Sequence, residues 1–489
     1  MTTRRRALTA TARAVGVLAV LGVGAALVAA SITPDRPERV AEPDSVLVSP
    51  AASIQQRVCP GPLLQIGDDS QSATAASSFG PTQLTTAVLP ADVEVEQVPI
   101  EAPDNPLASD DGGPVSLEAP ADAVEVGLLA GAQSQSAATE TLAGLAVAGC
   151  REPLDDAWLV GGSTALGRTT LILLANPTDV ASTVDLRIFG ETGAVDAPGG
   201  LGLVVPAHTQ RVVSLAGLAP DLASPVVHVT STGGRIAATL EQSAIDGLVP
   251  VGVELVGAAA PPADEQRIAG FAVVATADAV IDPDHSEGDG FPVLRLLAPG
   301  EDPVAVSVAV VPEGIGEGTT IEVSLEPGQV LDVPLSDLAP GDYAVDVMAD
   351  APVVAAARST VPPIAPDADA TALDSAAQGE PGDLAWYPAS GPLIGDVAVA
   401  VPDAPSPMLH LTSSGQAATV IVVSGGAEDR VEVAAGGSAS IAVEPGAALT
   451  LRGVEGLHAT ITVGDGQLLA AMPIEPPGPL DAPIRVYPR

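Results

Sequence analysis

An acidic loop with carboxylates at alternating positions is the candidate for metal chemistry in this sequence. The loop reads DPDHSEGDG over residues 282–290. Its candidate oxygen ligands for Ca²⁺ are Asp282, Asp284, Ser286 and Asp289. The loop is not an EF-hand, because its glycine falls one place late and Val293 stands where that loop needs a bidentate Glu. A solvated acidic turn between strands is the competing interpretation, and no other cofactor is predicted.

The only two cysteines, Cys59 and Cys150, are candidates for a disulfide bond. In an oxidising compartment such a pair is more often bridged than reduced. Redox chemistry would need a close cysteine pair or a thiol with a depressed pKa, and neither pattern is visible. The sequence therefore predicts a structural bond that closes a loop of about 90 residues.

Histidines and one glycine-rich turn are weaker candidates. The histidines are His208, His228, His285, His410 and His458. No two stand at metal-ligand spacing, and the three that fall in predicted strands are interpreted as surface or satisfied residues. Residues 161–164, Gly-Gly-Ser-Thr, could arrange backbone N–H groups around an anion beside Arg168. A tight turn is the alternative.

Common catalytic motifs are absent from the chain. It lacks the G-x-S-x-G elbow, the H-E-x-x-H helix, the P-loop and the C-x-x-C pair. All 19 basic residues are arginine, which excludes lysine Schiff bases and P-loop lysines. The sequence therefore predicts a protein that is not an enzyme.

Composition also limits the partners. A net charge of −42 argues against nucleic acid, because a duplex is bound by neutralising its phosphates with cations. The 489 residues include only four Phe, two Trp and three Tyr, which leaves few aromatic platforms for sugars.

The N-terminal segment predicts a membrane anchor. Residues 1–13 form a stub with four arginines, which should stay in the cytoplasm. Residues 14–34 are uncharged and long enough to span a bilayer as a helix, and residues 35–44 read as an extended linker. A cleaved signal peptide is the alternative, since Val28 and Ala30 are small residues spaced like a peptidase site. We expect a single-pass protein of the cell membrane with the bulk of the chain extracellular.

Most of the remaining chain has the pattern of β-strands. In residues 183–188 apolar Val184, Leu186 and Ile188 alternate with polar residues, which is typical of a half-buried strand. Fifty Gly and 47 Pro residues favour many short strands joined by turns over long helices. We predict an all-β protein.

Internal repeats divide this β region. The motif Leu215–Pro220 (LAGLAP) returns 120 residues later as LSDLAP, and aromatic residues open strands at Trp158, Phe271 and Trp386. We predict tandem antiparallel β-sandwiches of immunoglobulin or fibronectin type. The predicted units are residues 45–155, a divergent β domain that holds the disulfide, and repeats at 156–265, 266–365 and 380–489. Trp158 and Trp386 are interpreted as equivalent core residues.

Several short motifs resemble an uncharacterised family of membrane-anchored secreted proteins from high-GC Gram-positive (actinobacterial) organisms. These motifs are RVCPGP at 57–62, WLVGGST at 158–164, LLANP at 173–177 and VTSTGGR at 229–235. The resemblance covers most of residues 40–480 and rests on turns and strand ends. It implies an envelope setting, no required cofactor and no catalytic residues.

These observations lead to two competing functional hypotheses. The first is a non-enzymatic, membrane-anchored extracytoplasmic protein with a structural, adhesive or partner-organising role in the bacterial envelope. The second is a ligand-binding or accessory subunit for an envelope glycan enzyme. An envelope protein or glycan is the expected partner in both.

Overall fold

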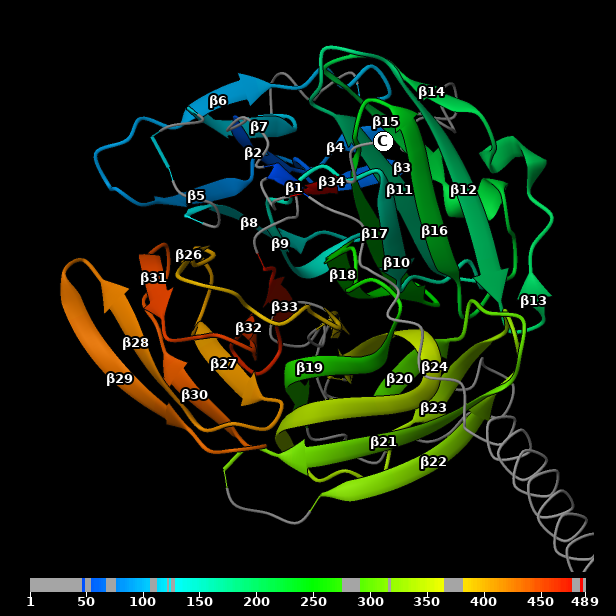
Figure 1. Ribbon diagram of the computed structural model, residues 1–489. Helices are drawn as coiled ribbons and strands as arrows, with labels where there is room; N and C mark the ends of the chain where they lie inside the picture. The colour runs from blue at the N-terminus through cyan, green and yellow to red at the C-terminus, as the bar shows by residue number, and fades with distance from the viewer. Residues whose placement is uncertain are drawn as a thin grey trace, which may run out of the picture. The chain divides into compact units, whose positions relative to one another are not determined.

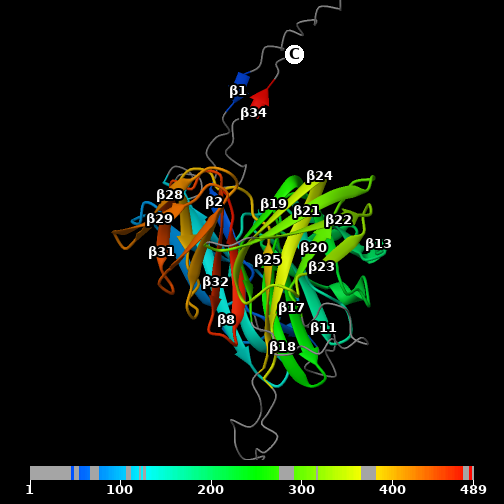
Figure 2. The ribbon, with the colours of Figure 1, turned by 90° about the horizontal axis from the view of Figure 1, so that it is seen from below.

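The computed structural model describes residues 46–48, 54–66, 76–105, 112–120, 123–124, 128–274, 291–314, 318–364, 381–476 and 484–486. The chain divides into two units, one formed by residues 1–50 with 482–489 and the other by residues 51–481. In the first unit, β1 (Val46–Val48) pairs with β34 (Ile484–Val486). All other strands belong to the second unit (Figures 1 and 2).

The described residues contain no α-helix, and their helical segments are the short 3₁₀ turns η1 (Pro198–Gly200) and η2 (Leu215–Gly217). None of their helices is long and apolar enough to cross a membrane. The predicted anchor at residues 14–34 and the predicted linker at residues 35–44 lie outside the described residues. The prediction of an all-β protein is confirmed for the described part of the chain.

Residues 156–257 fold into two antiparallel sheets, and we name them the second group. One sheet has the order β10 (Asp156–Val160), β16 (Val226–Gly233), β12 (Ser182–Gly190), β13 (Gly193–Ala194), with β14 (Leu203–Val205) also on β12. The other has the order β15 (Thr209–Ser214), β11 (Arg168–Asn176), β17 (Ala237–Asp246), β18 (Val249–Gly257).

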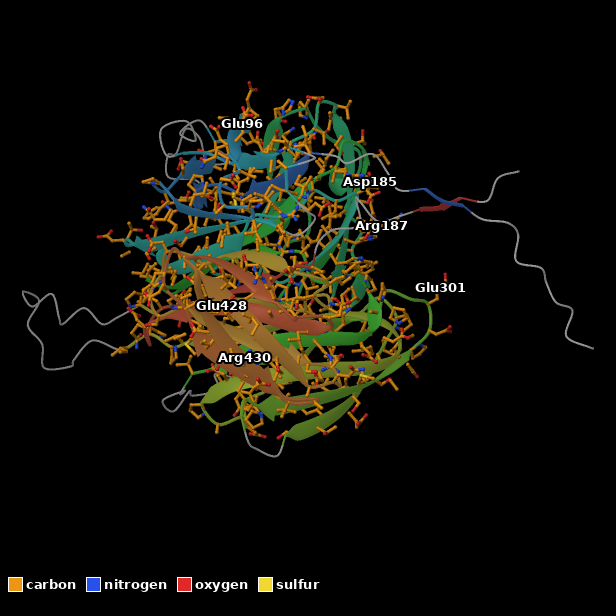
Figure 3. The ribbon with its side chains drawn as sticks, turned by 60° about the vertical axis from the view of Figure 1, so that its left-hand side comes forward. Glu96, Asp185, Arg187, Glu301, Glu428 and Arg430 are labelled. Carbon is orange, nitrogen blue, oxygen red and sulfur yellow. A yellow bond between two sulfur atoms is a disulfide. The ribbon has the colours of Figure 1, made fainter. Side chains whose placement is uncertain are left out.

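The alternation predicted for β12 determines which face of its sheet is buried. Val184, Leu186 and Ile188 are buried, whereas Asp185 and Arg187 lie on the opposite face and point outward (Figure 3). This is the two-residue period of a strand with one face in the core. Residues from both sheets of the second group then meet in one apolar cluster.

Residues 263–388, the third group, repeat this strand order. One sheet is β19 (Ala263–Val273), the first part of β24 (Gly341–Val361), β21 (Val304–Pro312) and β22 (Thr319–Leu325). The other is β23 (Val330–Pro334), β20 (Val293–Leu297), the second part of β24 and β25 (Asp383–Pro388). The long strand β24 thus takes the places of both β16 and β17.

Residues 397–474, the fourth group, show the order again. The sheets are β26 (Val397–Ala400), β31 (Ala448–Arg452), β28 (Ala418–Ser424), β29 (Ala427–Val433), and β30 (Ser438–Ala442), β27 (Met408–Ser413), β32 (Leu457–Gly464), β33 (Leu469–Ile474).

The first group, residues 55–149, has shorter sheets. They are β2 (Gln55–Cys59), β7 (Val115–Ala119), β6 (Glu96–Pro99), then β5 (Gln83–Val88), β8 (Leu129–Ala138), β9 (Ala143–Gly149), and the pair β3 (Leu64–Ile66) with β4 (Ala76–Ser78).

The strand order shares its centre, but not its edges, with an immunoglobulin domain. In the second group, β11 pairs with β15 and β12 pairs with β16, as strands B and E and strands C and F do. However, β10 pairs with β16 and β17 pairs with β11, whereas the immunoglobulin order places A beside B and G beside F. Relative to the immunoglobulin order, β10 and β17 are therefore exchanged between the two sheets.

The last strand of each group lies against the last strands of two other groups. β18 contacts both β9 and β25, and β33 contacts the same two strands. The apolar clusters cross these contacts. The cluster of the second group contains Val354 and Trp386 from the third, and the cluster of the fourth contains Leu145 and Val147 from the first. The groups therefore share their cores.

Trp158 and Trp386 do not occupy equivalent strands. Trp158 lies in β10, the first strand of the second group, and stacks on His228 with ring centroids 4.0 Å apart. Trp386 lies in β25, the last strand of the third group, which pairs with β24. Both side chains are buried, as expected for core residues. The predicted boundary at residue 380 would separate β25 from the sheet to which it is hydrogen-bonded.

The repeated motif LAGLAP at 215–220 and LSDLAP at 335–340, here called the LAP motif, lies in equivalent connections between strands. Leu215 follows β15 and Leu335 follows β23, and these two strands occupy the same place in their groups. Both leucines are buried. The motif therefore fixes a loop that inserts one leucine into the core, between β15 and β16 in the second group and between β23 and β24 in the third.

Candidate functional site

The structure describes some, but not all, of the candidate site residues that the sequence analysis named. The predicted Ca²⁺ ligands Asp282, Asp284, Ser286 and Asp289 lie outside the described residues, as does His285. His208 and His228 each lie 2.9 Å from an aspartate oxygen. Burial lowers the pKa of His458 to about 4, and its Nδ1 lies 2.7 Å from the carbonyl oxygen of Ser390.

The glycine-rich segment 161–164 is a buried connection without regular secondary structure, and the N–H groups of Ser163 and Thr164 bond within the protein. Ser163 N–H donates to Thr170 Oγ1 at 2.9 Å, and Thr164 N–H donates to the carbonyl of Leu222 at 2.7 Å. An anion would need these same donors. The N–H groups of Ser163 and Thr164 are therefore already used within the protein, and the turn itself lies two residues further on, at residues 166–167.

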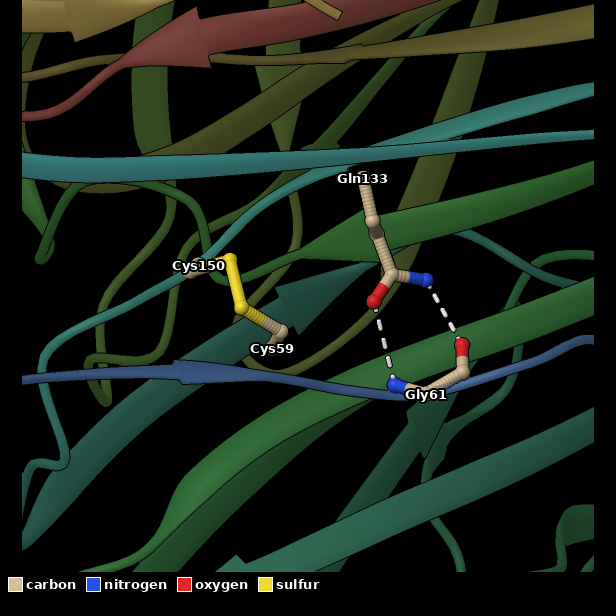
Figure 4. Close-up of a disulfide and its surroundings, with 4 residues drawn as sticks. All are labelled: Cys59, Gly61, Gln133 and Cys150. Carbon is tan, nitrogen blue, oxygen red and sulfur yellow. Dashed lines mark hydrogen bonds between the residues drawn. A yellow bond between two sulfur atoms is a disulfide. The ribbon is translucent and has the colours of Figure 1, made fainter. Parts of the chain in front are cut away.

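The predicted disulfide between Cys59 and Cys150 is present and joins β2 to the end of β9 (Figure 4). A Cβ on Gly131 would lie 2.7 Å from Cys150 Sγ, so only glycine leaves room for the bond at this position. Beside it, the Gln133 side chain accepts from Gly61 N–H at 3.1 Å and donates to the Gly61 carbonyl at 2.6 Å. The Gln133 amide thus makes the two backbone hydrogen bonds that a neighbouring strand would make with Gly61.

Loss of this disulfide should destabilise the protein by about 2 to 4 kcal/mol, because the bond restricts the unfolded chain over a separation of 91 residues. Chemical denaturation of the Cys59→Ala/Cys150→Ala double variant measures the loss. A reducing agent should lower the midpoint of the wild type and leave that of the variant unchanged. Equal midpoints for oxidised and reduced wild type would contradict the prediction.

A small pocket opens next to the disulfide, between the first and fourth groups. Its charged lining comes from Arg57, Arg151, Glu152 and Glu475. Residues of β8, β9, β26 and β33, Met472 among them, complete the wall. The pocket has a volume of about 80 Å³.

The pocket charges are arranged in pairs. Arg57 lies 3.6 Å from Glu152, and Arg151 lies 3.2 Å from Glu475. Arg151 Nη1 also donates to the carbonyl of Ala258 at 2.6 Å. Burial lowers the pKa of Arg57 and raises the pKa of Glu475, and in each case the opposite charges nearby act against the shift.

The size and lining of this pocket suit binding of a small group. Pockets for drug-sized ligands hold about 300 to 1,000 Å³, and this one has about 80 Å³, room for a few water molecules. Its lining contains no histidine, serine or reduced thiol, and its two glutamates, Glu152 and Glu475, are each paired with an arginine. The arrangement can hold a polar group between two ion pairs.

Buried carboxylates occupy the place where the last strands meet. Asp383 at the start of β25 accepts from the N–H groups of Leu145 in β9 and Leu469 in β33, both at 3.0 Å. It also accepts from its neighbour Leu384 at 2.9 Å. The last strands are edges of their sheets, so their inward N–H groups have no strand partner. Asp383 supplies the acceptors, and it joins three groups by doing so.

Two glutamates act in the same way. Glu254 in β18 accepts from Val147 N–H at 3.4 Å and from Leu255 N–H at 3.0 Å. Glu241 in β17 accepts from Leu64 N–H of the first group at 2.8 Å. Burial raises the pKa of Glu254 and of Asp383 well above the usual range, against the opposing effect of their N–H donors. Burial also raises the pKa of Glu241, to about 8.

Arg295 joins the second and third groups. Its side chain is fully buried, and its Nε and Nη2 donate to the two carboxylate oxygens of Asp332 at 2.8 and 2.9 Å. Its Nη1 donates to the carbonyls of Gly162 and Pro225 at 2.8 and 3.1 Å. The guanidinium also lies 4.7 Å from the ring centroid of Trp386. Burial acts to raise the pKa of Asp332, but Arg295, Ser224 and Arg358 together outweigh it and hold that pKa below its usual value.

The comparisons with known proteins identify the family. The signature of DUF5719, a family of unknown function, matches residues 106–453, which is most of the chain. The chain belongs to the DUF5719 family. This accords with the resemblance to an uncharacterised family that the sequence motifs indicated.

No curated protein matches this DUF5719 chain. A crystal structure of Thermotoga maritima 1070 is similar over 20% of this chain and 78% of its own, with 15% identity and a TM-score of 0.16. An anti-sigma factor domain-containing protein from Clostridium clariflavum is similar over 84% of this chain and 99% of its own, with 8% identity and a TM-score of 0.12. TM-scores this low do not establish a shared fold.

Some of the buried polar residues described above lie inside the region that matches DUF5719, and others lie outside it. Glu241, Glu254, Arg295 and Asp383 lie within the matched residues. Arg57 and Glu475 of the pocket lie outside them, as does Cys59. The polar residues that connect the groups of strands therefore lie in the region that defines the family. The pocket is built partly from sequence that flanks this region.

Sequence reasoning missed these buried charges in the DUF5719 chain, although a signal was present. Each lies within a short apolar run: Val-Glu-Leu around Glu254, Leu-Arg-Leu around Arg295 and Asp-Leu-Ala-Trp from Asp383. Charged residues are almost never fully buried unless they are paired. A single charge inside an apolar strand therefore indicates a buried partner, but not which strand supplies it.

Replacing Glu241 with glutamine should stabilise this DUF5719 protein at neutral pH. The folded state keeps the acid protonated up to about pH 8, whereas the unfolded chain loses the proton near 4.5. Stabilisation by the protonated form is therefore complete below about pH 4.5 and is lost as the pH rises through 8. At pH 7 the loss is about 3 kcal/mol, from 1.36 kcal/mol per pKa unit.

Urea denaturation between pH 4.5 and 9 measures this effect. The Glu241→Gln variant should lose less stability over this range than the wild type, since its amide oxygen still accepts from Leu64 and does not ionise. Glu428→Gln, at an exposed position, should leave the pH dependence unchanged. Parallel curves for Glu241→Gln and the wild type would show that Glu241 is ionised at low pH in the folded state.

Proposed function

We propose that this protein is a non-enzymatic, membrane-anchored extracytoplasmic protein with a structural, adhesive or partner-organising role in the bacterial envelope. Its groups would act as tandem β-sandwiches of immunoglobulin or fibronectin type. The segment at residues 14–34 would hold the chain in the cell membrane, with the bulk of it outside. An actinobacterial envelope, suggested by the sequence motifs, is the proposed setting.

The observation that carries this proposal is the use of the buried polar side chains. Asp383, Glu254 and Arg295 bond to groups other than their own, and the pocket with a charged lining in the described part of the chain has a volume of only about 80 Å³. Buried polar networks whose members bond to one another and to the backbone make a structure rigid. A rigid array with a strongly acidic exterior suits a scaffold that stays soluble and spaced from anionic wall polymers.

The experiment compares the full chain with a variant that lacks residues 1–40, each produced in an actinobacterial host. The full chain should remain in the membrane pellet after an alkaline carbonate wash, and protease added to protoplasts should degrade it. The shortened variant should stay in the cytoplasmic fraction. A full chain that resists protease until the cells are lysed, or that is recovered in the cytosol, would overturn the proposed location.

Binding to the envelope is tested separately with the detergent-solubilised full chain. It should co-sediment with isolated cell walls in the presence of Ca²⁺, which can bridge two acidic surfaces and can also bind the proposed loop of Asp282, Asp284, Ser286 and Asp289. A chelator should release it. Failure to sediment under either condition would argue against an adhesive role for which wall polymers are the partner.

The pocket favours a second candidate function, a ligand-binding or accessory subunit for an envelope glycan enzyme. Arg57 and Arg151 place two guanidinium groups beside a cavity that could take the terminal group of a larger molecule. Thermal unfolding with wall glycan fragments distinguishes the two functions. A rise in the unfolding temperature that Arg57→Gln abolishes would favour the second candidate, and no rise with any fragment would favour the first.

A further inference from the structure

One cluster of metal-ligating side chains lies apart from the pocket and from the buried carboxylates. It consists of Glu313, which follows β21, Asp342 in β24 and His410 in β27. One ligand atom from each residue lies within 4.8 Å of the others. Two of the residues come from the third group and one from the fourth. The cluster therefore bridges two consecutive groups through residues that lie up to 97 positions apart in the sequence.

The two carboxylates are fixed relative to one another by the backbone. Glu313 N–H donates to the carbonyl of Asp342 at 2.8 Å, at the end where β21 pairs with β24. The Glu313 side chain is 11% exposed, and Asp342 is an exposed residue. The cluster thus has one buried side and one side that an ion can reach from solvent.

The imidazole of His410 is buried and oriented from both ring nitrogens. Nδ1 lies 2.7 Å from Glu313 Oε1, and Nε2 lies 2.8 Å from Thr462 Oγ1. In the tautomer that donates Nε2–H to the threonine hydroxyl, the lone pair of Nδ1 points toward the carboxylates and can bind a metal ion. Metal-binding histidines characteristically have the second nitrogen held by a hydrogen bond of this kind.

An irregularity in β19 makes room for the ring. The pairing of β19 with β24 shifts register between Ile268 and Phe271, and Gly270 between them has a φ of 67°. A Cβ at Gly270 would lie 2.4 Å from His410 Cγ. Bulges often re-aim side chains next to functional sites, and here the bulge and the missing Cβ admit the imidazole.

The 2.7 Å separation of His410 Nδ1 and Glu313 Oε1 is that of a hydrogen bond, so a proton lies between the two atoms when no metal ion is bound. A metal ion that displaces this proton meets an imidazole and two carboxylates that the fold has already brought together. We propose that Glu313, Asp342 and His410 form a binding site for Zn²⁺ that connects the third and fourth groups. The two carboxylates and the imidazole supply three ligands, and water completes the tetrahedron.

The ligand set favours Zn²⁺ over Ca²⁺. Ca²⁺ takes six to eight oxygen ligands, whereas imidazole nitrogen with carboxylate oxygen suits Zn²⁺. Tetrahedral ligands at Zn distances lie about 3.3 Å apart. The pair of His410 Nδ1 and Glu313 Oε1 would therefore open by a few tenths of an ångström, which a side-chain rotation at Glu313 provides. This assignment does not depend on the proposed envelope function.

The test is a titration of the chelator-treated full chain with Zn²⁺, followed by calorimetry, and with Co²⁺, followed by its visible absorption. We expect one ion per chain and intense tetrahedral Co²⁺ bands. Asp342→Asn should weaken Zn²⁺ binding at least tenfold, and so should His410→Gln. Asp342 is exposed, so the Asp342→Asn variant should fold. It therefore decides the test even if the His410→Gln variant does not fold.

His208→Gln is the matched control. His208 also pairs with a carboxylate, that of Asp179, at 2.9 Å, but it has one acidic neighbour and lies on the surface. This variant should bind Zn²⁺ as the wild type does. Absence of binding by the wild type, or equal binding by the wild type and Asp342→Asn, would overturn the proposal and leave His410 as a proton-bridged partner of Glu313.

Discussion

Replacing Asp383 with alanine should leave the protein largely unfolded at temperatures where the wild type is folded. The carboxylate accepts three buried N–H groups, those of Leu145, Leu384 and Leu469. Each orphaned buried donor costs about 1 to 3 kcal/mol, so the loss is about 3 to 9 kcal/mol. The free energy of unfolding of a domain is only about 5 to 15 kcal/mol. Circular dichroism with thermal denaturation measures the loss.

Two variants make this prediction specific to the hydrogen bonds. Asp383→Asn keeps one acceptor oxygen and replaces the other by a donor, so its stability should fall between those of the wild type and Asp383→Ala. Asp396→Ala removes an exposed aspartate that lies 3.7 Å from Arg452, and it should cost less than about 1 kcal/mol. An Asp383→Ala protein as stable as Asp396→Ala would mean that water replaces the carboxylate at the junction.

Replacing Arg295 with methionine should destabilise the protein by about 3 to 5 kcal/mol, the cost of breaking a buried ion pair from one side. Methionine fills much of the volume of arginine. The loss of stability therefore comes mainly from the missing charge and hydrogen bonds of Arg295. Asp332 would be left with its charge and without its two strongest donors. The carbonyls of Gly162 and Pro225 would also lose their donor.

The Arg295→Met variant also tests whether the groups unfold together. Arg295 belongs to the third group and its carbonyl acceptors belong to the second, so hydrogen exchange should accelerate in both groups. Arg452→Met is the control, because Arg452 is half exposed and its ion pairs are 3.7 and 3.8 Å long. Faster exchange confined to the third group would show that the two groups unfold independently, as the sequence repeats alone suggest.

Whether the groups of strands unfold together matters for the proposed scaffold. A chain whose groups share apolar clusters and buried charges transmits a load through the whole second unit. Separate sandwiches on flexible linkers would unfold one at a time. The two buried-charge variants therefore distinguish a rigid array from a string of independent modules.

The sequence alone determined the features that depend on neighbours along the chain. Alternation in Val184, Leu186 and Ile188 predicts the strand and its buried face, because a strand places successive side chains on opposite sides. The LAP motif at Leu215 predicts a repeated connection for the same reason: the loop and its anchoring leucine are contiguous. Cys59 and Cys150 form the predicted bond because two cysteines allow only one pairing.

The tertiary structure decided the features that depend on contacts between distant strands. Trp386 follows the spacing of an opening strand, yet it lies in a closing strand, because β24 runs through two sheets and takes β25 as its partner. Asp383, Glu254 and Arg295 appear in the sequence only as isolated charges. Their roles follow from N–H groups on sheet edges that meet within the second unit, and from carbonyls of residues between strands, such as Gly162. No local pattern records which edges will meet, so the acceptors and donors for them cannot be assigned before the fold is known.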